Sequence, residues 1–338
     1  MPKLKIEQWP ELIETGKKSI LDAALDVGVP FPHGCGSGEC GQCKCQLLSG
    51  EVKREAASPD ALSSAEIAQG KLLACRSRLV GDVSLRWLSQ AAPLVAKKYT
   101  ARVVQVEPLA HDVMHVTLAL PETIHFHPGQ FAKLGFAKLA PRSYSMANQP
   151  GSGQLEFHIR IVPDGLVSGF IASELKLGDQ VSVEAPFGDA HWQGVSDAPV
   201  LLLAGGTGLA PIVAMLDAAL AQGQSTADLH VYHGVRSARD LYTGEKLRKM
   251  AQQHGFSFHA VYSHEPDENG RHGHLHEVLA SDFASLKSAQ IYVAGPPPMV
   301  DAVRTLATQR GADQTQIRAD AFYAAPEVKK GWFRRLIG

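Results

Sequence analysis

Pro32-His-Gly-Cys-Gly-Ser-Gly-Glu-Cys-Gly-Gln-Cys-Lys-Cys45 is the stretch on which the fold of the N-terminal region depends. Its first three cysteines have the spacing C-x4-C-x2-C, and a fourth cysteine follows downstream in Leu-Leu-Ala-Cys-Arg. This is the ligand spacing of plant-type 2Fe-2S sites, in which four thiolates hold two irons. The glycines between the cysteines adopt positive φ without steric cost, so a short loop can turn three thiolates toward one centre. The predicted metal ligands are Cys35, Cys40, Cys43 and Cys75.

Other interpretations of these cysteines stay open at this point. A structural zinc site usually has two matched C-x2–4-C pairs, whereas here three cysteines cluster and the fourth stands alone. A disulfide framework suits a small secreted chain, and this chain has 338 residues and five cysteines. The spacing favours a 2Fe-2S cluster over zinc and over unliganded thiols. Cys45 lies outside the pattern, at the start of a predicted strand over Lys44–Val52, and we expect it to face a different side from Cys43 as a buried spare thiol.

Composition excludes several classes of protein. The hydrophobic content of 45% and the charged content of 20% are those of an ordinary globular protein, and the length suggests two or three domains. A formal net charge of −1 argues against an obligate nucleic-acid partner. Nothing at the N-terminus reads as a signal peptide, so we expect a cytoplasmic protein. An uncharged run between Asp197 and Asp217 is long enough to span a membrane, but glycines and Pro211 interrupt it, so we predict a buried strand, a glycine loop and a helix instead.

The N-terminal residues 1–90 fit a β-grasp ferredoxin domain of the α+β class. The elements we predict for it are a hairpin at Leu4–Gln8 and Glu11–Thr15, a helix at Ser19–Val27 with Ser19 as N-cap, and a last strand at Val83–Leu88. The segment Leu72–Ser77 is expected to return Cys75 to the cluster. Residues 91–98 lack strong periodicity and are the predicted linker. His33, beside the cysteine loop, is expected to lie on the surface.

Two further domains follow. Residues 99–195 alternate apolar and polar side chains at period two, which predicts an antiparallel β-barrel with strands at Ala101–Val106, Val113–Leu120 and Leu155–Ile161. Residues 196–325 predict a doubly wound parallel sheet of the α/β class, in which helices alternate with strands at Val200–Ala204, Leu229–Gly234, Phe256–Tyr262 and Gln290–Ala294. Residues 326–338 form a basic and aromatic tail, which would dock an acidic partner, touch anionic lipid, or fray as a terminus.

The predicted barrel contains Pro-Arg-Ser-Tyr-Ser-Met-Ala-Asn at 141–148. Arg142 can neutralise a pyrophosphate with a charge-assisted fork. In a strand Arg142 and Tyr144 share a face, and Ser145 points the other way unless the strand bends. Taken alone, the octapeptide also reads as an ordinary strand. Its neighbours favour a phosphate site, because His-Ile-Arg at 158–160 lies on the next strand and Gly-Leu-Val-Ser at 165–168 opens a helix whose N-terminal amides suit a phosphate.

Two glycine turns mark the predicted parallel sheet. Gly-Gly-Thr-Gly at 205–208 joins a buried strand to a helix, which is the phosphate-binding arrangement of dinucleotide sites, although an ordinary tight turn is an equal alternative. Ala-Gly-Pro-Pro-Pro-Met at 294–299 lies at the same carboxyl edge, where ligands bind in such sheets. Met299 there would contact a nicotinamide or fill the core.

Taken in order, the cysteine loop, Arg-Ser-Tyr-Ser, Gly-Gly-Thr-Gly-Leu-Ala-Pro and Ala-Gly-Pro-Pro-Pro-Met resemble a ferredoxin–NAD reductase. They are similar in particular to the reductase components of bacterial aromatic-ring-hydroxylating dioxygenases of the naphthalene, carbazole and terephthalate types. The resemblance covers about residues 1–325. It implies a 2Fe-2S cluster, FAD and NADH as cofactors, with the barrel as the FAD domain and the parallel sheet as the NAD domain. It also implies an activity: hydride passes from NADH to FAD, and single electrons then pass through the cluster to a terminal oxygenase or an intermediary ferredoxin.

The resemblance also implies roles for residues. Tyr144 would lie against the isoalloxazine, Ser145 near flavin N5, and Phe322 would approach the flavin, although Phe322 also reads as a core aromatic. The implied FAD site consists of Arg142, Ser143, Tyr144, Ser145, His158, Arg160, Gly165 and Ser168. The implied donor site consists of Gly205, Gly206, Thr207, Gly208, Arg236, Asp240, Gly295, Pro296 and Met299.

The choice of donor and of acceptor is less sharply defined. An acidic residue after the second strand of the sheet would bind a ribose 2′-hydroxyl and an arginine would bind a 2′-phosphate, and both Arg236 and Asp240 are present there. The resemblance favours NADH. Alternative acceptors are a di-iron monooxygenase or a deoxysugar dehydratase. A redox-sensing regulatory protein is a further alternative, but a sensor needs no hydride entry site.

Overall fold

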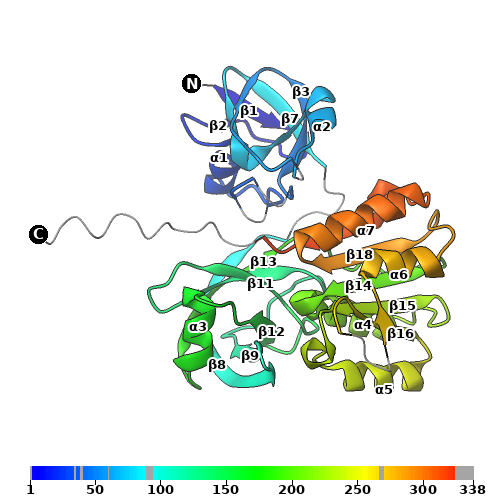
Figure 1. The fold of residues 1–338 in the computed structure, drawn as a ribbon. Helices are drawn as coiled ribbons and strands as arrows, with labels where there is room; N and C mark the ends of the chain where they lie inside the picture. The colour runs from blue at the N-terminus through cyan, green and yellow to red at the C-terminus, as the bar shows by residue number, and fades with distance from the viewer. Residues whose placement is uncertain are drawn as a thin grey trace, which may run out of the picture.

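The computed structural model describes residues 2–33, 36–38, 41–59, 61–88, 94–265 and 270–323. Cys35, Cys40 and the predicted tail 326–338 therefore lie outside the described residues. Figure 1 shows an N-terminal module in blue, a barrel in cyan and green, and a C-terminal sheet flanked by helices in yellow and orange. Their strands form a five-stranded sheet, two six-stranded sheets and a two-stranded ribbon.

The N-terminal module has the predicted β-grasp architecture. Its elements are β1 (Lys3–Ile6), β2 (Ile13–Glu14), α1 (Ile20–Asp26), β3 (Lys44–Ser49), β4 (Val52–Arg54), α2 (Ser64–Ala68), β5 (Lys71–Leu73), β6 (Ser77–Leu79) and β7 (Val83–Trp87). The sheet order is β2-β1-β7-β3-β5, with β1 parallel to β7. Ser19 caps α1 as predicted, because its Oγ accepts a hydrogen bond from the Asp22 amide at 3.1 Å.

The prediction of one strand over Lys44–Val52 is wrong. The chain turns at Gly50, which has φ +90°, so β3 ends at Ser49 and β4 pairs with β6 in a separate ribbon. A Cβ on Gly50 would lie 2.2 Å from the carbonyl oxygen of Asp82. The close approach of these two turns requires glycine, and a period-two pattern cannot show it because Asp82 is distant in sequence.

The barrel comprises β8 (Lys97–Ala110), β9 (Val113–Ala119), β10 (Phe131–Phe136), β11 (Arg142–Ser145), β12 (Gln154–Arg160), α3 (Leu166–Ser173) and β13 (Gln180–Phe187). All neighbours in the order β11-β10-β13-β8-β9-β12 are antiparallel, and a bridge between Met146 and Phe157 closes the sheet on itself. The predicted linker 91–98 is too long at its end, since Lys97 and Lys98 already pair with β13.

The C-terminal module is the predicted parallel sheet. Its elements are β14 (Val200–Gly205), α4 (Leu209–Ala221), β15 (Leu229–Val235), α5 (Gly244–His254), β16 (Ser257–Tyr262), β17 (Arg271–His272), α6 (Leu275–Asp282), β18 (Gln290–Gly295), α7 (Pro297–Gln309) and β19 (Ile317–Ala321). Every pair in the order β17-β16-β15-β14-β18-β19 is parallel. The central strand β14 is buried along its whole length, because helices cover both faces, which explains its continuous apolar sequence. Within the described ranges, no helix is long and apolar enough to cross a membrane.

Replacing Gly50 by alanine is expected to destabilise the N-terminal module. The new Cβ would meet the Asp82 carbonyl in a left-handed backbone conformation, so we expect a loss of about 3 kcal/mol in the free energy of unfolding. Gly16→Ala is the matched control, since Gly16 has φ +56° and nothing within 4 Å of its Cβ position, so it should lose only about 1 kcal/mol. Chemical denaturation followed by circular dichroism measures both, and equal losses would show that the contact with Asp82 is unimportant.

Candidate functional site

Two of the four predicted metal ligands are described, and the fold brings them together. Cys43 immediately precedes β3, and Cys75 lies in the short turn Ala74–Arg76 after β5. Their Sγ atoms are 3.2 Å apart, and the Cys75 amide donates to Cys43 Sγ at 3.4 Å. Convergent, buried thiols with an amide hydrogen bond to sulfur fit the ligands of an iron–sulfur cluster.

Cys45 is separate from this pair. Its side chain is 0% exposed, and its Sγ donates to the Leu72 carbonyl at 3.7 Å. Burial raises the pKa of this thiol far above its ordinary value, so it stays protonated. The predicted burial of Cys45 is confirmed, and its place outside the ligand set stays a prediction.

The strand β11 presents the motif Arg-Ser-Tyr-Ser with alternating burial. Ser143 is exposed, Arg142 and Tyr144 are half-buried, and Ser145 is only 8% exposed, so Ser145 faces away from the other two as predicted. Burial raises the pKa of Tyr144 to about 12, which keeps its hydroxyl protonated. The half-buried side chains of Arg142 and Tyr144 therefore place a positive charge and an aromatic ring on the same face of β11.

The helix α3 begins after Gly165, which provides no side-chain cap. The amides of its first turn are therefore available to an anion. Ser168 is buried, and its Oγ accepts from the Val162 amide at 3.1 Å. Ser168 thus shapes the turn that precedes the helix.

A cavity of about 190 Å³ lies at the carboxyl edge of the parallel sheet. Most of the implied donor residues line it, together with Arg160 from the barrel: Gly205, Gly206, Thr207, Arg236, Asp240, Pro296 and Met299. Gly208 lies behind it, where a Cβ would be 2.0 Å from the Ala294 carbonyl oxygen. Gly295 has φ +148°, and its Cβ would meet the backbone of Gly205. Glycine is required at both positions so that β14 and β18 can end close together.

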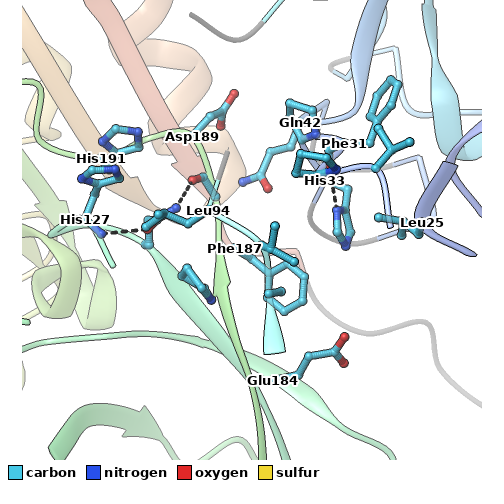
Figure 2. Close-up of a pocket in the computed structure, with 18 of the residues that line it drawn as sticks. Leu25, Phe31, His33, Gln42, Leu94, His127, Glu184, Phe187, Asp189 and His191 are labelled. Carbon is cyan, nitrogen blue, oxygen red and sulfur yellow. Dashed lines mark hydrogen bonds between the residues drawn. The ribbon is translucent and has the colours of Figure 1, made fainter. Parts of the chain in front are cut away.

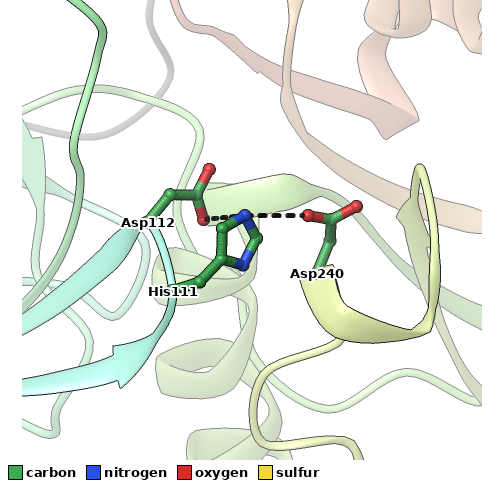
Figure 3. Close-up of side chains that lie close together, drawn as sticks. All are labelled: His111, Asp112 and Asp240. Carbon is green, nitrogen blue, oxygen red and sulfur yellow. Dashed lines mark ion pairs between the residues drawn. The ribbon is translucent and has the colours of Figure 1, made fainter.

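Two carboxylates that line this cavity, Asp112 and Asp240, lie on either side of His111, as Figure 3 shows. His111 Nε2 lies 3.5 Å from Asp240 Oδ1 and 3.9 Å from Asp112 Oδ1. Asp240 Oδ2 accepts from the amide and hydroxyl of Ser237, so this carboxylate also caps the turn after β15. Asp112 Oδ2 accepts from Arg160 Nε at 2.9 Å. The neighbouring implied residue, Arg236, is exposed.

Sequence reasoning missed Asp320 as a functional residue. It lies near the end of β19, next to Ala294 in the parallel register. Ser145 Oγ donates to Asp320 Oδ2 at 3.3 Å across the junction between barrel and sheet. Burial raises the pKa of Asp320 to about 7, and the nearby Asp189 adds to this, while the bond from Ser145 opposes it. A carboxyl group at the carboxyl edge of a parallel strand was the available signal.

Phe322 follows β19 at the same junction. Its amide donates to the Gly295 carbonyl at 2.9 Å, and its half-buried ring packs against a core cluster that includes Trp192 and Leu209. His158 lies on β12, where its Nδ1 and the Tyr242 hydroxyl share a hydrogen bond of 3.3 Å. The fold therefore brings the ends of β11, β14, β18 and β19 to one place.

The expectation of a surface position for His33 is wrong. Its ring packs edge-on against Phe187 of the barrel at 5.0 Å, and Phe187 stacks on Phe131 at 5.6 Å. Figure 2 shows the cavity of about 210 Å³ at this junction, with Phe31, His33 and Gln42 on the N-terminal side and Phe187 and His127 on the barrel side. The contact joins residues far apart in the sequence, which no local pattern reveals.

Comparison with known proteins agrees with this geometry. Residues 8–80 match the 2Fe-2S iron-sulfur cluster binding domain, residues 100–192 the oxidoreductase FAD-binding domain, and residues 202–305 the oxidoreductase NAD-binding domain. The chain is 34% identical over 316 residues to the ferredoxin–NAD(P)+ reductase component of the naphthalene 1,2-dioxygenase system of Pseudomonas putida, covering 90% of this chain and 93% of that one. It is 37% identical over 317 residues to the reductase subunit of an Amycolatopsis aromatic O-demethylase, covering 91% and 95%.

Solved structures give the same result. The Amycolatopsis cytochrome P450 reductase GcoB matches with a TM-score of 0.80 and 34% identity over 95% of this chain and 99% of that one. The ferredoxin reductase in carbazole 1,9a-dioxygenase matches with a TM-score of 0.72 and 30% identity over 95% and 98%. The resemblance stated from the motifs and the three-module fold are confirmed. This chain belongs to the family of oxidoreductases that join a 2Fe-2S ferredoxin domain, an FAD-binding domain and an NAD-binding domain in one reductase component.

Proposed function

We propose that this protein takes hydride from NADH and passes single electrons to a terminal aromatic-ring-hydroxylating oxygenase or to its ferredoxin. When bound, the flavin accepts two electrons as hydride and releases them singly, and the 2Fe-2S cluster carries them one at a time. The hydrogen bond between Ser145 and Asp320 carries the proposal, because it joins β11 of the barrel to the carboxyl ends of β18 and β19 in the parallel sheet. Anaerobic titration with NADH tests it: flavin and cluster absorbance should bleach in steps, and an unbleached flavin would overturn it.

The domain boundaries we propose follow the sequence: ferredoxin domain 1–90, FAD domain 99–195 and NAD domain 196–325. The family matches at 8–80, 100–192 and 202–305 support them. The beginning of β8 at Lys97 supports a linker that ends two residues earlier than predicted.

We also place the protein in the cytoplasm, where NADH is available and thiolate ligands stay reduced.

In this proposal, the barrel binds the flavin nucleotide. Arg142 would neutralise the pyrophosphate, the amides after Gly165 would donate to it, and Tyr144 would contact the isoalloxazine. Tyr144 suits that role because it is half-buried and its hydroxyl stays protonated, so its ring carries no charge. Ser145 is held by Asp320, so its oxygen has a fixed position at the junction. Phe322 covers the junction from the C-terminal side.

Asp320 provides a place for a proton. Each hydride whose two electrons are passed on would leave one proton at the site. The Ser145 hydroxyl bridges the junction, and Asp320 Oδ2 would take up that proton through it. A pKa of about 7 suits this exchange near neutral pH, because both protonation states of Asp320 are then accessible.

Asp320→Asn is expected to slow steady-state electron transfer by about tenfold or more, because the amide cannot accept a proton. In the unmodified protein, the rate should rise with pH through about 7, as the carboxyl ionises, and the variant should lose this dependence. The free energy of unfolding should change in the opposite direction to the rate. The pKa of Asp320 is about 7 in the folded protein and about 4 in the unfolded chain. The free energy of unfolding therefore falls as the pH rises from about 4 to about 7. The exposed Asp228→Asn serves as the control, and an unchanged pH profile in the Asp320 variant would contradict the role.

Cys43→Ala should abolish the cluster, whereas the equally buried Cys45→Ala should retain it. Iron content should fall from about two per chain to near zero in the first variant only. Reduction of ferricyanide by NADH should persist in both, since it needs only the flavin, while cytochrome c reduction should be lost with Cys43. Loss of iron in the Cys45 variant would place that thiol among the ligands.

NADH is expected to have a lower KM than NADPH in a dye-reduction assay. Asp112 and Asp240 line the donor cavity together with Arg236, and their carboxylates disfavour a 2′-phosphate. A lower KM for NADPH would show that Arg236 dominates the site.

The acceptor is identified by reconstitution. Two relatives correspond to the alternative acceptors. The xylene/toluene monooxygenase electron transfer component of Pseudomonas putida is 34% identical to this chain. The CDP-6-deoxy-L-threo-D-glycero-4-hexulose-3-dehydrase reductase of Yersinia pestis is 31% identical. NADH-driven product formation with a Rieske oxygenase, but with neither alternative, would support the main proposal.

A further inference from the structure

One buried histidine in the parallel sheet has no part in the function proposed so far. His233 lies on β15 and is 0% exposed. Its Nε2 lies 3.0 Å from the carbonyl oxygen of Gly206, so Nε2 carries the hydrogen and donates. Burial lowers the pKa of His233 to about 4, which keeps the ring neutral under ordinary conditions.

The environment of His233 Nδ1 indicates that filling space in the core is not the reason for a histidine at this position. His233 Nδ1 is buried and finds no hydrogen-bond partner within the part of the chain that the structure describes. An apolar side chain of similar size would fill the same volume without this unfavourable burial. The bond from Nε2 to Gly206 is the interaction that only the histidine supplies.

Gly206 is the residue at which the chain turns from β14 into the glycine turn. It has φ +54°, a left-handed conformation that glycine adopts without strain. In a trans peptide unit the carbonyl of one residue and the amide of the next point in opposite directions. Holding the Gly206 carbonyl toward His233 therefore directs the Thr207 amide away from His233. Gly206 and Thr207 both line the donor cavity, whereas His233 does not. The Gly206 carbonyl also accepts from the Leu209 amide, so His233 adds a second restraint on the same oxygen.

Tyr242 holds the histidine ring from the side of the cavity. Its ring packs edge-on against His233 at 5.6 Å and against His158 of the barrel at 5.3 Å. Its hydroxyl shares a hydrogen bond with His158 Nδ1 at 3.3 Å. The barrel thus fixes Tyr242, Tyr242 restrains His233, and His233 restrains the glycine turn.

We propose that His233 is a positioning residue for the donor: its hydrogen bond to Gly206 sets the glycine turn so that the Thr207 amide binds a phosphate oxygen of the dinucleotide. This inference rests on the proposed function, since it assigns the cavity to NADH. The ligand chemistry it requires is a nucleoside diphosphate group.

The test compares two side chains of equal length in the full-length, FAD-loaded protein. His233→Gln keeps an N–H donor near the position of Nε2, whereas His233→Met removes it. Binding of ADP-ribose, which carries the pyrophosphate without the nicotinamide, is measured by isothermal titration calorimetry. We expect His233→Met to bind about five- to tenfold more weakly and His233→Gln to stay within about twofold of the unmodified protein. The KM for NADH should rise with the dissociation constant, with kcat little changed.

Two further variants serve as controls for the comparison of His233→Gln with His233→Met. His230→Met changes another histidine of β15, one that does not line the cavity, and should bind ADP-ribose normally. If His233→Met loses its FAD, His233→Phe keeps a ring against Tyr242 but lacks the donor, and the same weakening is expected.

The outcomes separate the two ideas. Equal affinity in the donor-containing and donor-free variants would overturn the positioning role. Failure of the unmodified protein to bind ADP-ribose would instead overturn the assignment of the cavity to NADH, and with it the proposed function.

Discussion

The close approach of β14 and β18 at their carboxyl ends is the constraint on which the functional site depends. Gly208 packs so closely on the Ala294 carbonyl that a Cβ would be 2.0 Å from it, and Gly295 packs on Gly205 in the same way. Because these strands end together, the glycine turn opens into the cavity beside β18. The parallel register of β18 with β19 then sets Asp320 next to Ala294, from where it reaches Ser145. The glycines at the ends of β14 and β18 thus help to position the carboxyl group of Asp320 against the barrel.

Buried groups at the junctions of the modules are polar but largely uncharged. Burial lowers the pKa of His158 to about 3 and that of His191 to about 4, so both imidazoles are neutral. Neutral rings still donate and accept hydrogen bonds, as His158 does for Tyr242. The hydrogen bond between His158 and Tyr242 therefore joins barrel and sheet without the desolvation penalty of an ionic contact. Half-buried Asp320 differs from these imidazoles, because its pKa of about 7 places its ionisation at neutral pH.

Local chemistry was predictable from the sequence, and long-range contacts were not. Ser19 caps its helix because the cap depends on residues three positions apart, and the strand–turn–helix pattern of residues 200–221 depends only on its own apolar run and glycines. Three contacts could not be predicted, because each joins residues that are far apart in the sequence. These contacts are Gly50 with Asp82, His33 with Phe187 and Asp320 with Ser145. For Asp240, the position after β15 could be predicted from the sequence. Its hydrogen bonds to Ser237 and its contact with His111 could not.

The position of β19 in the chain also determines when the protein becomes complete during its synthesis. Domains fold as they leave the ribosome, beginning with the N-terminal one. The ferredoxin module, the barrel and most of the parallel sheet precede Asp320 and Phe322 in the sequence. A nascent chain can therefore fold its cofactor-binding modules before the junction between barrel and sheet has its last two residues. Until β19 has been synthesised, a nascent chain therefore lacks both the hydrogen bond from Ser145 to Asp320 and the one from the Phe322 amide to Gly295.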